Sequence, residues 1–134
     1  MLKHILSLAG LILALFAAIT YVALESGGVV TVETVDRSTD ESRVTRIWFV
    51  LADEGLFLEA GTPTNSWVED LEHASTIKLA GHNLDGEYTF NIQCEPAGHQ
   101  SIRALMRSKY GWRDLWITIL FDTSQSRLVE VIRL

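Results

Sequence analysis

The sequence is poor in cysteine, in closely spaced histidines and in positive charge. Cys94 is the single cysteine among 134 residues, which excludes an intramolecular disulfide and a zinc site built from cysteines. The four histidines include no pair four residues apart, so a helical metal-binding pair is not predicted. Eleven basic residues stand against seventeen acidic ones. This balance disfavours a general nucleic-acid binder, because such proteins neutralise phosphates with Lys and Arg.

Long apolar runs are also scarce, since only one exists. It extends from Ile5 to Leu24 and contains no charged residue. At about 1.5 Å per residue, such a helix spans about 30 Å, the thickness of a bilayer's hydrocarbon core. A polytopic membrane protein would need several runs of this kind and is excluded. We expect an uncleaved anchor rather than a signal peptide, because the run exceeds a typical signal core and its end fits the cleavage rule poorly.

The flanking charges predict an orientation and a domain boundary. Lys3 and the amino terminus are positive, whereas Glu25, the first residue after the apolar run, is negative. The positive-inside rule therefore places the N-terminus in the cytoplasm. We therefore expect a transmembrane anchor over residues 1–26 and one extracytoplasmic, periplasmic domain over residues 27–134. The alternative is a protein secreted after signal cleavage. Lys3 is the only charged residue in the first 24, so the formal charge of −6 becomes −7 on the rest of the chain.

The soluble part shows mainly the two-residue periodicity of strands. Apolar and polar residues alternate most strictly from Tyr88 to Cys94, which predicts a strand with one buried and one polar face. Branched and aromatic residues dominate residues 43–52, and a turn at 53–55 connects them to residues 56–59 as a hairpin. Further strands are expected at 30–35, 76–80 and 128–134, so the total is six.

Two or three short helices interrupt these strands. Ser66 and Glu69 fit a capping box, which predicts a helix over residues 66–73. Residues 101–110 form an amphipathic, basic pattern that ends at Gly111, a typical residue after a helix C-terminus. Residues 112–121 fit a strand by propensity and a helix by their apolar stripe. Together these elements predict a mainly β, α+β domain, a small antiparallel barrel with helical insertions.

Common catalytic motifs are absent from the sequence. It contains no nucleophile elbow, phosphate loop, zinc-protease helix or dinucleotide fingerprint. The acid pair Asp53–Glu54 lies in the predicted hairpin turn, and Glu69–Asp70 lies in the first turn of a predicted helix, where the helix dipole favours acids. Both pairs are therefore interpreted as structural, and so is His73 near the end of that helix.

Five segments in order resemble the deazaflavin-dependent nitroreductases, a family within the flavin-binding split-β-barrel superfamily that includes the pyridoxamine-phosphate oxidases. The resemblance covers residues 29–134 and implies a six-stranded split barrel in which residues 112–121 are helical. The segments that carry it are Thr45–Val50, Gly55–Leu58, Trp67 with Leu71, Lys109–Gly111 and Val131–Leu134.

The resemblance implies an oxidoreductase, of the nitroreductase or quinone-reductase type, with a deazaflavin or FMN bound in a surface groove. Arg43 and Arg46 would hold the cofactor phosphate through paired donors, and Lys109 would add a point charge. Trp67 and Lys78 complete the candidate cofactor site. Tyr110 would be catalytic, donating a hydrogen bond to a small-molecule electron acceptor while the cofactor supplies hydride. The family also implies a homodimer.

One departure from the family motivates a second hypothesis. The turn between the first two strands carries Asp40 and Glu41 where the family has a glycine and a base. Two acids oppose a bound phosphate by like-charge repulsion. The alternative is therefore a non-catalytic envelope domain on the same scaffold, which binds a lipid, a quinone or a protein partner. A third hypothesis, an OB-fold binding module, is disfavoured because the acid excess opposes oligonucleotide binding.

Overall fold

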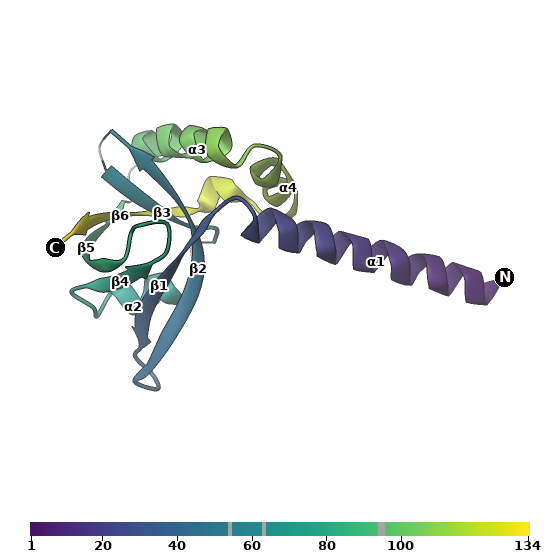
Figure 1. The fold of residues 1–134 in the computed structure, drawn as a ribbon, viewed down its shortest axis with the longest axis horizontal. Helices are drawn as coiled ribbons and strands as arrows, with labels where there is room; N and C mark the ends of the chain where they lie inside the picture. The colour runs from purple at the N-terminus through teal and green to yellow at the C-terminus, as the bar shows by residue number, and fades with distance from the viewer. Residues whose placement is uncertain (54, 63, 94–95) are drawn as a thin grey trace.

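The computed structural model describes residues 1–53, 55–62, 64–93 and 96–134, and it shows one barrel with a long helix projecting from it (Figure 1). The described elements follow one another in this order: α1 (Leu2–Glu25), β1 (Val29–Asp36), β2 (Glu41–Ala52), β3 (Gly55–Ala60), α2 (Ser66–Leu71), β4 (Ile77–Ala80), β5 (Gly86–Gln93), α3 (Pro96–Tyr110), α4 (Trp112–Leu120), a 3-10 turn (Thr123–Gln125) and β6 (Arg127–Arg133).

The six strands close into an antiparallel barrel in the order β1-β2-β3-β6-β5-β4. The alternation read from the sequence decides which side chains point inward. In β1, for example, Val30, Val32 and Thr34 are buried whereas Glu33 and Val35 are exposed. Closure leaves no unpaired edge, which would otherwise invite pairing with another chain. The predicted fold class, a six-stranded antiparallel barrel with short helices and an N-terminal apolar helix, is confirmed.

Two apolar clusters stabilise this arrangement. The first fills the barrel interior and is closed at one end by α2, whose Trp67, Val68 and Leu71 are buried. The second lies on the outer face of β2, β3 and β6, where α3 and α4 cover Trp48 and Phe57. Ala23, near the end of α1, belongs to the second cluster and is fully buried. The last turns of α1 are therefore packed on the barrel.

The helices α2 and α3 differ in detail from the sequence-based expectations: α2 begins at Ser66 as predicted but ends at Leu71 rather than at residue 73. The predicted capping box is wrong, because Asn65 is the N-cap of α2 and Ser66 is its first helical residue. The backbone carbonyl oxygen of Asn65 accepts hydrogen bonds from the backbone N–H groups of Val68 and Glu69. The helix expected to begin at residue 101 begins at Pro96, a residue that suits the first turn because its missing N–H would have no helical partner there.

Residues 112–120 are helical, as the family resemblance implied for all but the last residue of 112–121, because tertiary packing outweighs the strand propensity of Ile117-Thr118-Ile119. Phe121 is already extended. Asp114 and Ile117 of α4 face inward and are buried. Gly111 separates α3 from α4 with a φ of +55°, in the left-handed region that favours glycine. This residue lets the chain turn sharply, so that α4 reaches the end of α1 (Figure 1).

Candidate functional site

A pocket of about 320 Å³ lies where the end of α1, the strands β2 and β3 and the helix α4 meet. Its volume lies at the lower end of the range for small-molecule sites. Most of its lining surface is apolar, and the apolar lining residues are Leu24, Ile47, Trp48, Trp67, Ile117 and Phe121. The polar lining residues are Glu25, Thr45, Arg46, Glu59, Thr62, Asn65 and Thr123. The pocket thus offers an apolar cavity with a few polar groups around it.

The positive charge of Arg46 is balanced at the rim of this pocket. Its Nε and Nη2 atoms each lie 2.6 Å from Oε2 of Glu25, in the last turn of α1. The Arg46 side chain is 57% exposed, so water screens this pair and its net contribution to stability is small, roughly 0–1 kcal/mol. Arg46 therefore ties α1 to β2 loosely and can exchange its partner.

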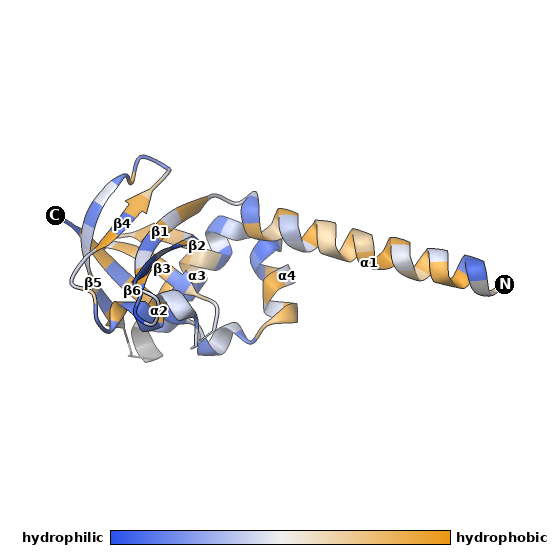
Figure 2. Ribbon diagram, turned by 90° about the horizontal axis from the view of Figure 1, so that it is seen from below, coloured by the Kyte–Doolittle hydropathy of each residue, from blue (hydrophilic) through white to orange (hydrophobic). Residues whose placement is uncertain are grey.

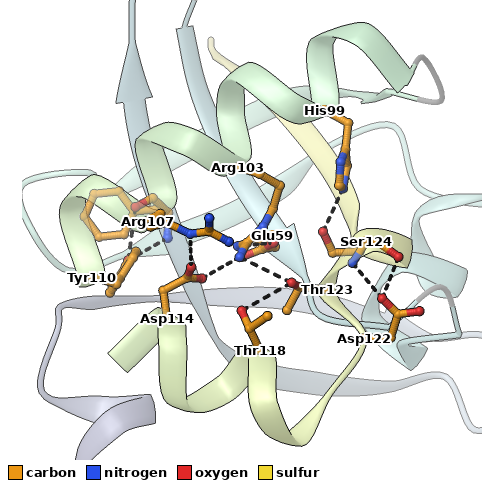
Figure 3. A network of polar contacts seen from close by, with 12 residues as sticks. Glu59, His99, Arg103, Arg107, Tyr110, Asp114, Thr118, Asp122, Thr123 and Ser124 are labelled. Carbon is orange, nitrogen blue, oxygen red and sulfur yellow. Dashed lines mark hydrogen bonds and ion pairs between the residues drawn. The ribbon is translucent and has the colours of Figure 1, made fainter. Parts of the chain in front are cut away.

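Glu59 forms the buried polar wall of the pocket (Figure 3). Both of its carboxylate oxygens accept from Nη1 of Arg103, at 2.7 and 2.8 Å. Burial raises the pKa of Glu59, and the charge and hydrogen bonds of Arg103, together with a hydrogen bond from Ser126, oppose that rise. The carboxylate is therefore held by partners inside the protein rather than by water.

Arg103 also bridges to α4, because its Nη2 lies 2.5 Å from Oδ1 of Asp114. Asp114 is fully buried, and its other oxygen is 3.4 Å from Nε of the exposed Arg107. Figure 3 shows how Arg103 from α3 reaches both carboxylates at once. This network of Glu59, Arg103 and Asp114 fastens α3 and α4 to the barrel. Sequence reasoning missed it, although an acid in the apolar strand Leu56–Ala60 was a usable signal.

Arg43 lies outside the pocket and already has two carboxylate partners. Its Nη2 pairs with Asp36, and its Nε lies 2.9 Å from Oδ2 of the buried Asp70. The same Asp70 oxygen accepts a hydrogen bond of 2.7 Å from the Thr34 hydroxyl. Arg43 thus ties the β1–β2 hairpin to α2, which also supports the structural interpretation of Asp70.

A phosphate group does not fit the residues around that hairpin. Arg37 lies 2.5 Å from Nε2 of His73 and Arg43 is shared by two acids, while Asp40 and Glu41 add two further negative charges. A phosphate would have to displace Asp36 and the buried Asp70 from Arg43 and then face the remaining acids. The described residues of this hairpin therefore do not form the phosphate site that the family resemblance implies for a flavin or deazaflavin.

Lys109 and Tyr110 lie at the end of α3, on the side of β2 away from the barrel interior. Nζ of Lys109 donates to the carbonyl of Phe49 at 2.6 Å and lies 3.2 Å from the centre of the Phe49 ring. Burial lowers the pKa of Lys109 to about 8. The ammonium group of Lys109 therefore already interacts with a backbone carbonyl and an aromatic ring.

Tyr110 is fully buried, and its hydroxyl is hydrogen-bonded to β2 and to Gly28, the residue before β1. Its hydroxyl accepts from the N–H of Phe49 at 3.0 Å and lies 2.8 Å from the carbonyl oxygen of Gly28, to which it can donate. Its ring stacks on Trp48 with the ring centroids 4.1 Å apart. Burial raises the pKa of the phenol above its usual range. A side chain on Gly27 would overlap the Tyr110 ring, so this close approach requires glycine.

The six candidate residues of the sequence do not converge on one site. Arg46 and Trp67 line the pocket, whereas Arg43, Lys109 and Tyr110 do not. Lys78 is exposed on β4, paired in register with Glu33 of β1 and Glu87 of β5. The roles predicted for these residues in binding and catalysis stay predictions. The pocket residues that sequence reasoning missed include Leu24 of α1, Glu59 of β3 and Ile117 of α4, which are distant in sequence.

Neither a known family model nor a curated protein sequence matches the chain. Solved structures do match it, among them HutZ, the heme storage protein from Vibrio cholerae, with a TM-score of 0.57, 14% identity and coverage of 84% of this chain and 85% of that one. A protein related to general stress protein 26, of the pyridoxinephosphate oxidase family, from Clostridium acetobutylicum matches with a TM-score of 0.53, 15% identity and coverage of 83% and 78%. An F420 reductase matches with a TM-score of 0.50, 16% identity and coverage of 83% and 89%.

These likenesses show the fold, at identities too low to show more. The chain has the split-barrel fold of the pyridoxamine-phosphate-oxidase-like proteins. Some of the structural neighbours that share this fold are oxidoreductases. The split-barrel fold that the resemblance implied is therefore confirmed. The narrower resemblance to deazaflavin-dependent nitroreductases stays a prediction.

Proposed function

We propose that this protein is a membrane-anchored split-barrel protein whose pocket binds an uncharged, lipophilic ring compound of the quinone type. The observation that carries the proposal is the pocket at the base of α1, where two tryptophans, Trp48 and Trp67, lie among apolar side chains. Flat aromatic side chains favour flat ligands. The polar lining groups Thr45, Asn65 and Thr123 can orient carbonyl oxygens of such a ligand.

The charges of the pocket support an uncharged ligand over a phosphorylated one. Arg46 is balanced by Glu25, and Arg103 is balanced by Glu59 and Asp114. An anion would therefore meet no unpaired cation among the described lining residues. A neutral ring compound needs no counter-charge, and burying its apolar surface is favourable at roughly 25 cal/mol per Å².

The contacts of α1 support an uncleaved anchor over a signal peptide. Ala23 is fully buried in the apolar cluster beneath α3 and α4. The backbone carbonyl of Leu24 accepts a hydrogen bond of 2.9 Å from Nε1 of Trp48, and Glu25 pairs with Arg46. Cleavage near these positions would remove part of the domain's own packing. The extracytoplasmic location of the barrel rests on the flanking charges alone.

The experiment is a ligand titration of the full chain in lipid nanodiscs. A short-chain quinone is added while tryptophan fluorescence is recorded, because Trp48 and Trp67 line the pocket. We expect saturable quenching by the quinone and none by FMN. Unsaturable quenching, equal to that of free tryptophan, would contradict the proposal.

A matched pair of glycine variants separates pocket binding from partition into lipid. Gly61 lines the pocket, and a Cβ atom there meets no heavy atom within 4 Å, so Gly61→Leu adds a bulky side chain to the pocket lining from a Cβ position that has room. Gly10 in α1 is equally free of neighbours and lies far from the pocket, so Gly10→Leu is the control. We expect a loss of saturable binding in the first variant and unchanged binding in the second.

The second candidate function is the flavin- or deazaflavin-dependent oxidoreductase that the resemblance implies. It is supported by the shared fold of an F420 reductase and by Arg46, whose exposed pair with Glu25 can exchange for a phosphate at small cost. Arg43, Lys78 and Lys109 would have to leave their present positions to contact a cofactor in the pocket. If this candidate is right, FMN or a deazaflavin binds with a spectral shift, and Glu25→Gln strengthens that binding by freeing Arg46.

A further inference from the structure

Helix α4 carries an apolar stripe that no described part of the chain covers. Trp112, Leu115 and Ile119 lie three and four residues apart, on one helical face, and are 50%, 62% and 72% exposed. Phe121 follows directly after the helix and is also exposed. Water-facing apolar residues of this size, gathered on one short helix, indicate a surface that meets another apolar medium.

The position of α4 identifies that medium. The ring of Trp116 lies 5.5 Å from the ring of Phe16 in α1, and its Nε1 donates to Oγ1 of Thr20 at 3.1 Å. Figures 1 and 2 both place α4 beside the barrel end of α1, and in Figure 2 both helices are mainly in the orange of apolar residues. One side of α4 therefore contacts the very segment that is apolar enough to cross a membrane.

The depth of these contacts follows from helix geometry. Thr20 and Phe16 precede Leu24, the last apolar residue of α1, by four and eight residues, which corresponds to about 6 and 12 Å along the helix axis. Half of the hydrocarbon core measures about 15 Å. A bilayer that surrounds the apolar length of α1 therefore also reaches Trp116 and the helix that carries it.

We propose that α4 is embedded in the surface of the bilayer, with Trp112, Leu115 and Ile119 inserted into the lipid. This inference rests on the assignment of α1 as a membrane span in the proposed function. Tryptophan is enriched at membrane interfaces, and an interfacial helix needs an apolar face of this kind. The barrel is then held at the membrane surface by two elements rather than hanging from a single helix.

The charged residues next to α4 suit the headgroup region. Arg113 stacks over Trp112 at 5.1 Å and donates to Oγ of Ser26 at 2.8 Å, just beyond the end of α1. Arg107 of α3 is also exposed. Asp114, the only acid of α4, points inward to Arg103 and is fully buried. Cations therefore face the level of the lipid phosphates, while the acid is withdrawn from it.

The consequence for the pocket is access from the membrane. Leu24 of α1, Ile117 of α4 and Phe121 just beyond α4 all line it. With α4 embedded, the pocket lies at the lipid surface, where a lipophilic compound is concentrated.

The test measures lipid contact at single positions in the full chain. A nitroxide label is attached to Ile119→Cys in a Cys94→Ser background and reconstituted in nanodiscs that contain anionic lipid. Its collision rates with oxygen, which concentrates in lipid, and with a water-soluble nickel complex are compared by electron paramagnetic resonance. The matched control is Ile132→Cys near the C-terminal end of β6, where the side chain is similarly exposed. Figure 1 places the C-terminus at the end of the barrel far from α1. Leu13→Cys in α1 serves as the lipid reference.

We expect the ratio of oxygen to nickel collisions at residue 119 to approach that at residue 13 and to exceed that at residue 132 severalfold. A lipid signal at residue 13 with a water signal at residue 119 overturns the proposal, and so does a water signal at both. Leu115→Cys repeats the measurement on the same stripe in case one variant misfolds. None of these labels reports on quinone binding, so this measurement tests the position of α4 even if the quinone titration fails.

Discussion

The Tyr110→Phe substitution distinguishes a structural from a chemical role for this residue. Phenylalanine keeps the ring that stacks on Trp48 and removes only the hydroxyl. The buried N–H of Phe49 then loses its acceptor, and the half-buried Gly28 carbonyl loses a donor that water can replace. One orphaned buried N–H costs about 1–3 kcal/mol and one lost hydrogen bond about 1 kcal/mol, so the free energy of unfolding should fall by roughly 2–4 kcal/mol.

The assay is urea unfolding of the full chain in detergent micelles, followed by near-ultraviolet circular dichroism. Tyr88→Phe is the matched control, because Tyr88 is also buried but its hydroxyl makes one bond, of 2.9 Å, to the Leu84 carbonyl. We expect a loss of only about 0.5–1.5 kcal/mol there. The argument is refuted if Tyr110→Phe is no more destabilising than Tyr88→Phe. Loss of enzyme activity with unchanged stability would instead support the catalytic role.

Two further predictions concern buried charge. Burial lowers the pKa of Lys109 from 10.5 to about 8, so between these values the unfolded chain binds more protons and stability rises as the pH increases from 8 to 10. Urea midpoints should show this rise in the native chain and not in Lys109→Met, and parallel curves would contradict it. Arg103→Met leaves Glu59 and Asp114 buried without their cation and should cost about 3–5 kcal/mol, whereas Arg107→Met, at an exposed position, should cost less than about 1 kcal/mol. Equal urea midpoints for these two variants would show that the network does not hold α3 and α4.

Strands were predictable because their signal is local. The alternation of Val30 and Val32 with Glu33 and Val35 needs no knowledge of the partner strand, and the structure buries the residues that the pattern selects. Residues 112–121 show the limit of such reasoning. Their sequence pattern is compatible with both a strand and a helix. In the structure they form the helix α4, which contacts α1 and α3.

The candidate site was harder to predict, because a charged residue does not reveal its partner. Arg43 and Arg46 were identified as cations on the second strand, which is correct, and assigned to a phosphate. Arg43 pairs with Asp36, 7 residues away, and with Asp70, 27 residues away, whereas Arg46 pairs with Glu25, 21 residues away. The acids Asp40 and Glu41 were the one local sign against a phosphate site here.

By itself, the sequence determined the six strands, the position of the apolar helix and the excess of acid, since each depends on neighbouring residues or on simple sums. Only the tertiary structure decided that Tyr110 bonds to Gly28, 82 residues away, and that α4 lies against α1. It also decided that Arg43 and Arg46 are neutralised within the chain. Burial and ion pairing depend on groups that meet only when the barrel closes, and these contacts determine what the pocket can bind.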